Sequence, residues 1–144
     1  MVDLPVLRAD LYPPVGEMCS LRVLEQLTLK VVEASPDAKI VVDRQGVIVL
    51  LNQMAELMFG YHRSALLGCP IELLLPEEVR ERHVQHLRRF FAEPRQREMG
   101  YGMQLQGRNC DGELFSVQIK LAPLVVIEGG VFTLAVVRRV WTTE

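Results

Sequence analysis

Residues 39–51 read KIVVDRQGVIVLL, and this stretch decides how the chain folds. Two short runs rich in β-branched residues, Lys39–Asp43 and Val47–Leu51, flank the segment Arg44-Gln45-Gly46. The glycine can adopt the positive φ of a tight turn, so the pattern predicts a β-hairpin. Because both runs are apolar on both faces, neither is expected to be a simple surface strand.

Three further strands are expected in the last third of the chain. Apolar and polar residues alternate along 101–106 and again along 115–121, a period of two that buries one face of each strand. Asp111-Gly112 supplies the turn between these strands, and Gly129-Gly130 supplies the next turn. The final run, 131–137, is apolar on both faces and therefore needs cover on each side.

Helices are expected before and after the first hairpin. The first covers 20–34, and short helices at 54–59 and 63–67 each end at a glycine. A longer helix is expected from Glu77 to about Phe91. The pattern predicts an α+β domain, with one five-stranded sheet that carries helices on one face.

The expected helix over 20–34 has more apolar surface than a single contact needs. Its seam follows heptad-like spacing, and further apolar residues widen that seam. We expect the helix to cover the outer face of its own sheet and to contact a second copy of the chain; one wide core face is the alternative. The predicted dimer interface comprises Leu21, Leu24, Leu27, Val31, Phe132, Leu134 and Val136.

Composition points to one ordinary globular domain. The 144 residues are 49% hydrophobic and carry a formal net charge of −2, so neither nucleic acid nor a membrane surface is expected as a partner. The three cysteines lie far apart without metal-ligand spacing, and no signal peptide or membrane span is apparent. We expect a cytoplasmic location and three segments: an irregular arm at 1–19, a flanking helix at 20–34 and the domain proper at 35–140.

The expected helix over 77–91 turns a histidine toward apolar surroundings. Val79, His83, Leu87 and Phe90 lie on one stripe, with His86 at its flank. A neutral imidazole on such a stripe can ligate a metal or pack as a core side chain. No nucleophile elbow, zinc-protease motif or phosphate-binding loop occurs, so the chain is not expected to be an enzyme.

Several motifs, in order, resemble those of the PAS (sensory box) family. The resemblance covers about residues 34–139 and implies a sheet in the order 2-1-5-4-3, with short helices walling a pocket. It also implies a sensor and dimerisation module of signalling proteins such as two-component systems. An effector domain or partner such as a kinase or a cyclic-dinucleotide enzyme is implied as well. The motifs are Asp43–Asn52, Phe59-Gly60-Tyr61, Leu66-Leu67-Gly68 and Gly107–Phe115.

Within that family, the chain resembles the haem-binding oxygen sensors. Their iron-ligating histidine falls at His83, and their haem-propionate contacts fall at Arg89 and Arg97. Tyr101 converges on the same pocket, and Met103 replaces the arginine that holds oxygen in these sensors. Because a thioether donates no hydrogen bond, Met103 either ligates iron or fills space. The sequence leaves the cofactor unknown, and haem b is the one that the resemblance implies. With haem bound, Met103 would favour a six-coordinate or redox-responsive site over strong oxygen binding.

Two functions stay open at this point. One is a sensory PAS domain that binds a small ligand or cofactor in its core pocket and homodimerises through its N-terminal helix and sheet. The other is a ligand-free PAS module for dimerisation or protein interaction, with an empty pocket and His83 packed as an ordinary side chain.

Overall fold

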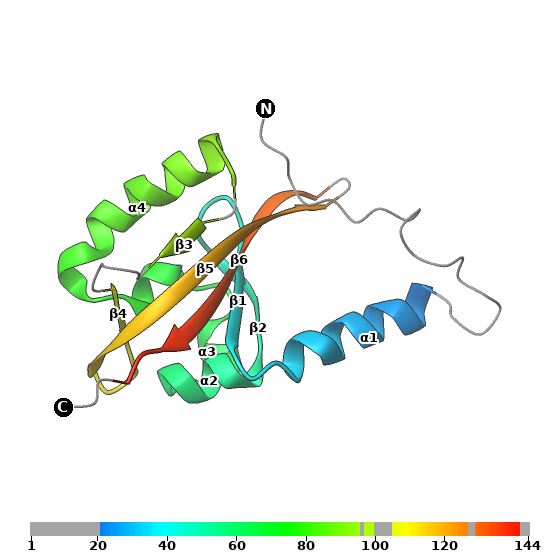
Figure 1. Ribbon diagram of the computed structural model, residues 1–144, viewed down its shortest axis with the longest axis horizontal. Helices are drawn as coiled ribbons and strands as arrows, with labels where there is room; N and C mark the ends of the chain where they lie inside the picture. Colours follow the sequence, from blue (N-terminus) through cyan, green and yellow to red (C-terminus); the bar gives the residue numbers. More distant parts are fainter. Residues whose placement is uncertain (1–20, 96, 100–104, 127–128, 142–144) are drawn as a thin grey trace.

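The computed structural model describes residues 21–95, 97–99, 105–126 and 129–141 (Figure 1). Its helices are α1 (Leu21–Glu33), α2 (Gln53–Phe59), α3 (Arg63–Leu66), the 3₁₀ helix η2 (Ile71–Leu74) and α4 (Glu77–Ala92). Its strands are β1 (Ala38–Val42), β2 (Ile48–Leu51), β3 (Arg97–Met99), β4 (Leu105–Arg108), β5 (Leu114–Val126) and β6 (Gly130–Arg139).

The strands form one antiparallel sheet in the order β2-β1-β6-β5-β3, and β4 also pairs with β5. Strands β3 and β4 follow one another along the same edge of β5, with Arg97 opposite Leu121 and Leu105 opposite Val117. Counted as one interrupted strand, they complete five strands in the order 2-1-5-4-3, which confirms the expected topology. Most of the strand expected at 101–106 lies outside the described residues.

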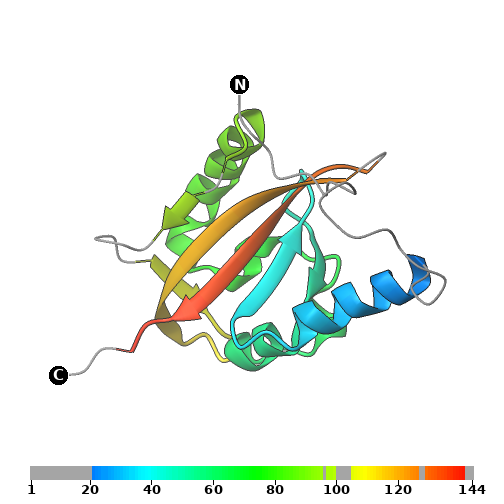
Figure 2. The ribbon, with the colours of Figure 1, turned by 45° about the vertical axis from the view of Figure 1, so that its right-hand side comes forward.

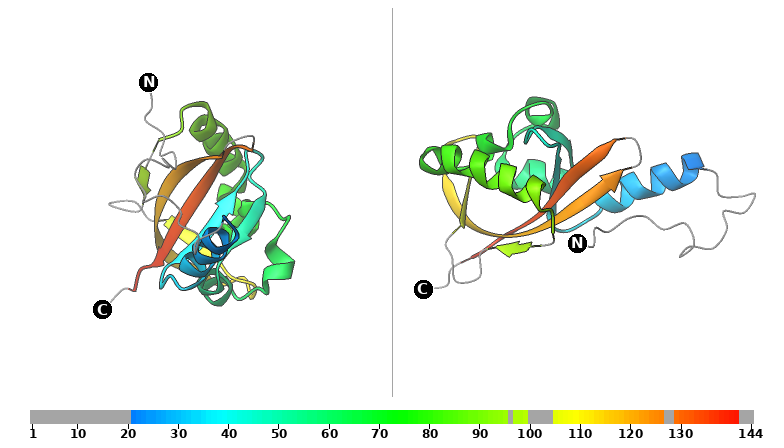
Figure 3. Two further views of the ribbon diagram at one scale, coloured as in Figure 1. Left: turned by 90° about the vertical axis from the view of Figure 1, so that its right-hand side faces the viewer. Right: turned by 90° about the horizontal axis from the view of Figure 1, so that it is seen from above.

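The core lies between the sheet and the helices on its inner face. Strand β1 buries Ala38, Ile40 and Val42 on this face, and side chains of β6 directly opposite share it because paired residues point the same way. Helices α2, α3 and α4 all lie on this side, as expected (Figure 3). Buried partners from the helices and from β5 complete the core: Ala55, Phe59, Leu66, Leu74, Phe115 and Val117.

A glycine in β4 allows two aromatic rings to approach closely. The ring centroids of Phe59 and Phe115 are 5.4 Å apart, a separation typical of favourable aromatic pairs. A Cβ at Gly107 would lie 3.0 Å from a ring carbon of each, closer than side chains normally pack. The absence of a side chain at Gly107 therefore lets α2, β4 and β5 close around one cluster.

Asn52 joins α1, β1 and α2 through one buried side chain. Its Oδ1 accepts from the backbone N–H of Ala55 and of Lys39, each at 3.0 Å. Its Nδ2 donates to the carbonyls of Val32 at 2.9 Å and Asp37 at 3.0 Å. The residue caps α2 and satisfies backbone groups on either side of the α1–β1 connection.

Helix α1 projects away from the sheet rather than covering it (Figures 1 and 3). Residues 22–31 are exposed along its length, and Leu27 and Val31 expose 50% and 65% of their surface. The expectation that this helix covers the outer face of its own sheet is therefore wrong. The described contacts that fix it are at its C-terminal end, through Val32 and Glu33.

The outer face of the sheet is apolar along its middle. Phe132, Leu134 and Val136 of β6 lie there and are half-buried. Figure 2 shows β6 at the centre of the sheet, between β1 and β5. Among the described helices, none combines the length and the apolar character needed to cross a bilayer.

Candidate functional site

Helix α4 turns His83 inward, as the stripe of apolar residues predicted. The helix follows Pro76 and carries Glu77 and Glu78 in its first turn, where the helix dipole favours negative charge. Val79, His83 and Leu87 are half-buried and Phe90 is buried, whereas His86 is exposed. The two histidines of this helix therefore lie in different environments, although only three residues separate them.

His83 contacts a buried carboxylate that the sequence analysis did not select. Its Nδ1 lies 3.4 Å from Oε1 of Glu72 in η2. Glu72 is only 9% exposed, and its second oxygen, Oε2, is buried without a hydrogen-bond partner among the described residues. A glutamate within the apolar run Ile71–Leu75 was the available signal, since charged side chains are rarely buried without a partner.

The turn between β1 and β2 closes over this pair. Gly46 is buried with a φ of +80°, and a Cβ there would lie 2.6 Å from Cδ2 of Leu87 and 3.8 Å from Oε1 of Glu72. The carbonyl of Gly46 accepts from the N–H of Ile71 at 2.9 Å. The hairpin turn, η2 and α4 thus meet at the His83–Glu72 pair.

The pair has the chemistry of a supported metal ligand. A carboxylate can only accept a hydrogen bond, so the contact with Glu72 requires the proton on Nδ1. In a neutral imidazole this leaves the lone pair on Nε2 available. Histidines that ligate metals commonly donate their other N–H to a carboxylate in this manner. His83 could therefore serve as one protein ligand of haem iron.

The remaining predicted pocket residues are not brought together in the described part of the chain. Arg89 is exposed on α4. Arg97 pairs with Leu121 through β3, and its side chain lies outside the described residues. Tyr101 and Met103 also lie outside them. Their contacts with a cofactor remain predictions.

Two further polar groups are buried without a partner among the described residues. They are Nη2 of Arg80, whose Nε donates to the carbonyl of Leu75 at 3.1 Å, and Oγ1 of Thr133 on the inner face of β6. Buried polar groups usually have hydrogen-bond partners. Such atoms are candidates to contact a bound molecule inside the domain. No group of three or more potential metal-binding side chains occurs in the described part of the chain.

A second polar cluster lies at the base of α1. Arg63 Nη2 bonds Glu33 at 2.8 Å and Glu56 at 2.9 Å, and Glu33 also accepts from the backbone of Gln53 at 3.0 Å. The hydrogen bond from Arg63 lowers the pKa of the Glu56 carboxyl, and those to Glu33 and Glu56 raise the pKa of Arg63.

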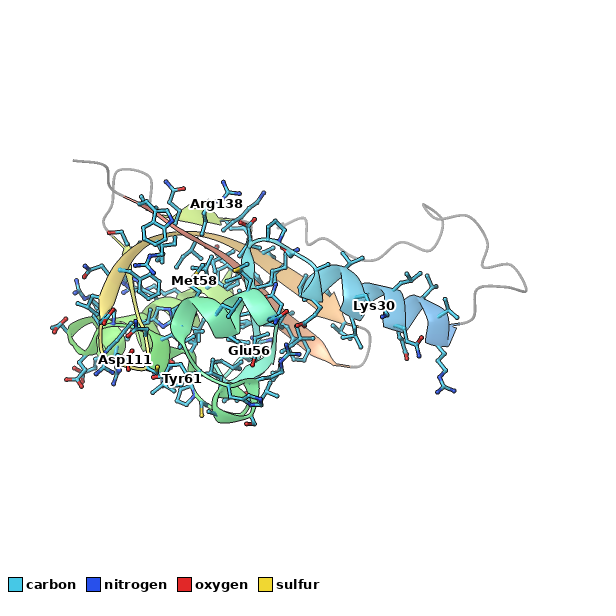
Figure 4. The ribbon with its side chains drawn as sticks, turned by 90° about the horizontal axis from the view of Figure 1, so that it is seen from below. Lys30, Glu56, Met58, Tyr61, Asp111 and Arg138 are labelled. Atoms are coloured by element: carbon cyan, nitrogen blue, oxygen red, sulfur yellow. The ribbon has the colours of Figure 1, made fainter. Side chains whose placement is uncertain are left out.

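A surface cavity of about 300 Å³ lies beside this cluster, between α1 and β2, and not at His83. Figure 4 shows Glu56 on α2 and Lys30 on the projecting α1.

The predicted dimer residues divide between two surfaces. Leu24, Leu27 and Val31 are exposed on α1, and nothing is described for the side chain of Leu21. The three residues of β6 lie on the outer face of the sheet. These surfaces do not meet within one copy of the chain, because α1 points away from the sheet (Figure 3).

Comparison with known proteins identifies the family. The model of the PAS fold matches residues 27–140. The chain belongs to the PAS family. This PAS domain resembles the PAS domain of an HTR-like protein from Haloarcula marismortui, with a TM-score of 0.69 and 27% identity, covering 83% of this chain and 94% of that one.

Two curated relatives of this PAS domain are sensors by name. The chain is 29% identical over 105 residues to Sensor protein FixL of Bradyrhizobium diazoefficiens, covering 73% of this chain and 21% of that protein. It is 28% identical over 99 residues to Oxygen sensor protein DosP of Escherichia coli, covering 69% of this chain and 12% of that protein. The chain thus spans about a fifth of the length of the first relative and about an eighth of the second. This PAS domain is a sensory domain of signal transduction.

Proposed function

We propose that this PAS domain senses a redox or gaseous signal through haem b, with His83 as the protein ligand of the iron. The observation that carries the proposal is the His83–Glu72 pair, in which the buried carboxylate contacts Nδ1 at 3.4 Å and leaves Nε2 available. An imidazole in this arrangement suits iron, and haem, when bound, would supply a redox-active centre.

The relatives and the charges on α4 support the same proposal. One relative is named an oxygen sensor, and the chain resembles haem-binding sensors at His83 and at Arg89. Arg89 is exposed six residues after His83, so it is available to a propionate at the rim of a site. Met103 replaces an oxygen-holding arginine, which favours a redox-responsive site over strong oxygen binding.

Haemin titration of the purified chain tests the proposal. We expect uptake of one haem per chain with a Soret band, loss of uptake in His83→Ala and retained uptake in His86→Ala. His86 is the matched control because it is an exposed histidine of the same helix. Thermal unfolding of each variant establishes that it is folded before titration.

Absence of a Soret band in the folded wild-type chain would refute the haem proposal. Equal uptake by wild type and His83→Ala would refute the assignment of the ligand. The first result would favour the second candidate, a ligand-free dimerisation or interaction module, for which the exposed apolar residues of α1 are the supporting observation.

The proposal also concerns how the domain assembles and which partner receives its signal. The assembly is a homodimer in which α1 of each copy lies on the outer sheet face of the other, since a twofold interface uses the same surfaces twice. The signal passes to an effector domain or partner, such as a kinase or a cyclic-dinucleotide enzyme; the far greater length of the curated relatives is consistent with it. A cytoplasmic location is part of this proposal and accords with the free thiols of Cys69 and Cys110.

A further inference from the structure

We infer that Glu72 is a positioning residue that holds His83 in the Nδ1-protonated tautomer and thereby presents Nε2 to the cofactor. The inference rests on the proposed function, because it gives Glu72 a role toward the ligand of that same site. It starts from a carboxylate that is 9% exposed and contacts the imidazole at 3.4 Å.

The burial of Glu72 is costly for stability alone. A buried carboxylate normally needs partners for both oxygens, and leaving one without a partner destabilises the fold. Here Oε1 faces His83, and Oε2 has no hydrogen-bond partner in the part of the chain that the structure describes. A leucine at this position would continue the apolar run from Ile71 to Leu75 without that cost. The presence of a charged side chain at this position therefore points to a role in determining the tautomer of His83.

The position of Glu72 is fixed from several sides. The backbone carbonyl of Glu72 accepts from the N–H of Leu75 at 3.1 Å, and η2 is bound to the hairpin turn through Ile71 and Gly46 at 2.9 Å. Leu87, one turn after His83, lies against that same turn. Because both elements pack on the turn, the carboxylate and the imidazole have little freedom to separate. Such rigid support is what a positioning residue requires.

Among the described groups, Glu72 is the acid that the structure places in contact with His83. The exposed acids of the same helix are Glu77, Glu78 and Glu81, and the described contacts of His83 do not include them. Loss of the acceptor at Glu72 should therefore affect His83 in a way that loss of Glu77 does not.

Two substitutions distinguish the role of Glu72 as a hydrogen-bond acceptor from the role of its negative charge. Glu72→Gln keeps an oxygen that can accept from Nδ1 but removes the negative charge. Glu72→Leu removes the acceptor and restores an apolar side chain, so the fold should persist. Glu77→Gln is the matched control, because it removes one exposed negative charge from α4.

The first measurement uses the chain without cofactor. ¹⁵N-edited imidazole spectra report the tautomer of each histidine. The His83 signals are those that are absent from the spectrum of His83→Ala. We expect the Nδ1–H tautomer for His83 in wild type, Glu77→Gln and Glu72→Gln. In Glu72→Leu we expect the Nε2–H tautomer to dominate, as it does for free imidazole side chains in water.

The second measurement uses haemin. We expect Glu72→Leu to bind haemin 10- to 100-fold more weakly than wild type, the range typical for loss of a partner of a metal-binding histidine. The midpoint potential of the bound iron should rise in Glu72→Gln and rise further in Glu72→Leu, because a charged acceptor makes the imidazole more basic and favours ferric iron. Glu77→Gln should match wild type in both respects.

The outcomes distinguish the inference from the function it rests on. Haemin uptake with unchanged tautomer, affinity and potential in Glu72→Leu would overturn the inference and leave the haem proposal standing. No uptake by wild type, together with an Nδ1–H tautomer that Glu72→Leu loses, would overturn the haem proposal and uphold the positioning of His83. No uptake together with an Nε2–H tautomer in wild type would overturn both.

Discussion

At the scale of single residues, Asn52 makes the most connections of any described side chain that is fully buried. It caps α2 and satisfies four backbone groups from three segments. Its motif was noticed in the sequence, but its bonds to Val32 and Asp37 were not predicted, because they join positions 20 and 15 residues apart. Local patterns reveal a helix cap more readily than they reveal such distant partners.

Asn52→Ala should destabilise the domain by about 2–4 kcal/mol, because it removes a helix cap and leaves buried backbone groups unpaired. The measurement is urea unfolding followed by circular dichroism. Gln53→Ala is the control, since the neighbouring side chain is exposed, and its effect should stay within about 0.5 kcal/mol. Equal unfolding midpoints for the two variants would contradict the assigned role.

Glu56 should make stability depend on pH. The hydrogen bond from Arg63 lowers the pKa of Glu56 in the folded chain. A carboxyl with a lowered folded pKa stabilises the fold above its unfolded pKa, and this contribution is lost as pH falls through the folded pKa. Glu56→Gln should therefore flatten the fall in the free energy of unfolding below the ordinary glutamate pKa. Urea titrations at acidic and neutral pH measure that slope; Glu25→Gln, an exposed acid of α1, should leave it unchanged.

At the scale of elements, prolines and glycines predicted the ends of helices. Helix α4 was expected from Glu77 to about Phe91 and runs to Ala92, and α2 ends at Gly60 as expected. These boundaries are predictable because proline and glycine restrict or free the backbone at their own positions. The direction of α1 was not predictable. Apolar spacing shows which side of a helix avoids water but not what covers that side. The same limit concealed Glu72, whose partner lies eleven residues away on another helix.

Arg63 anchors α1 to α2 and α3, so its removal should loosen α1 more than the core. Arg63→Ala should speed amide hydrogen exchange in the last turn of α1, while global stability falls by less than about 1 kcal/mol, as is usual for exposed ion pairs. Mass-spectrometric exchange measures the first effect and urea unfolding the second. Arg82→Ala, exposed on α4, should change neither. Unchanged exchange in α1 would contradict the anchoring role of Arg63.

At the scale of the whole molecule, the sheet order was predicted and the register along β5 was not. Met99 lies opposite Ile119 and Leu105 opposite Val117, an offset that alternation along 101–106 does not reveal. The structure describes the side chains of His83 and Arg89, whereas those of Arg97, Tyr101 and Met103 lie outside the described residues. Three of the five residues of the predicted cofactor site therefore remain predictions.

The exposed seam of α1 should bind a second copy of the chain. Leu24→Glu combined with Val31→Glu should convert a dimer to a monomer, because both side chains are exposed and apolar in the single chain. Light scattering after size exclusion measures the mass. Arg22→Gln combined with Gln26→Glu changes the net charge equally on the polar side of α1 and should preserve the dimer. A wild-type monomer, or a double-glutamate variant that stays dimeric, would contradict the proposed interface.

The pairing of β1 with β6 also determines where a longer polypeptide would attach. Ala38 lies opposite Val137, and Asp37 contacts Arg138 at 3.4 Å. The base of α1, which precedes β1, and any segment that follows β6 therefore leave the sheet at the same corner. A shift of β1 relative to β6 would change the spacing between these two attachments.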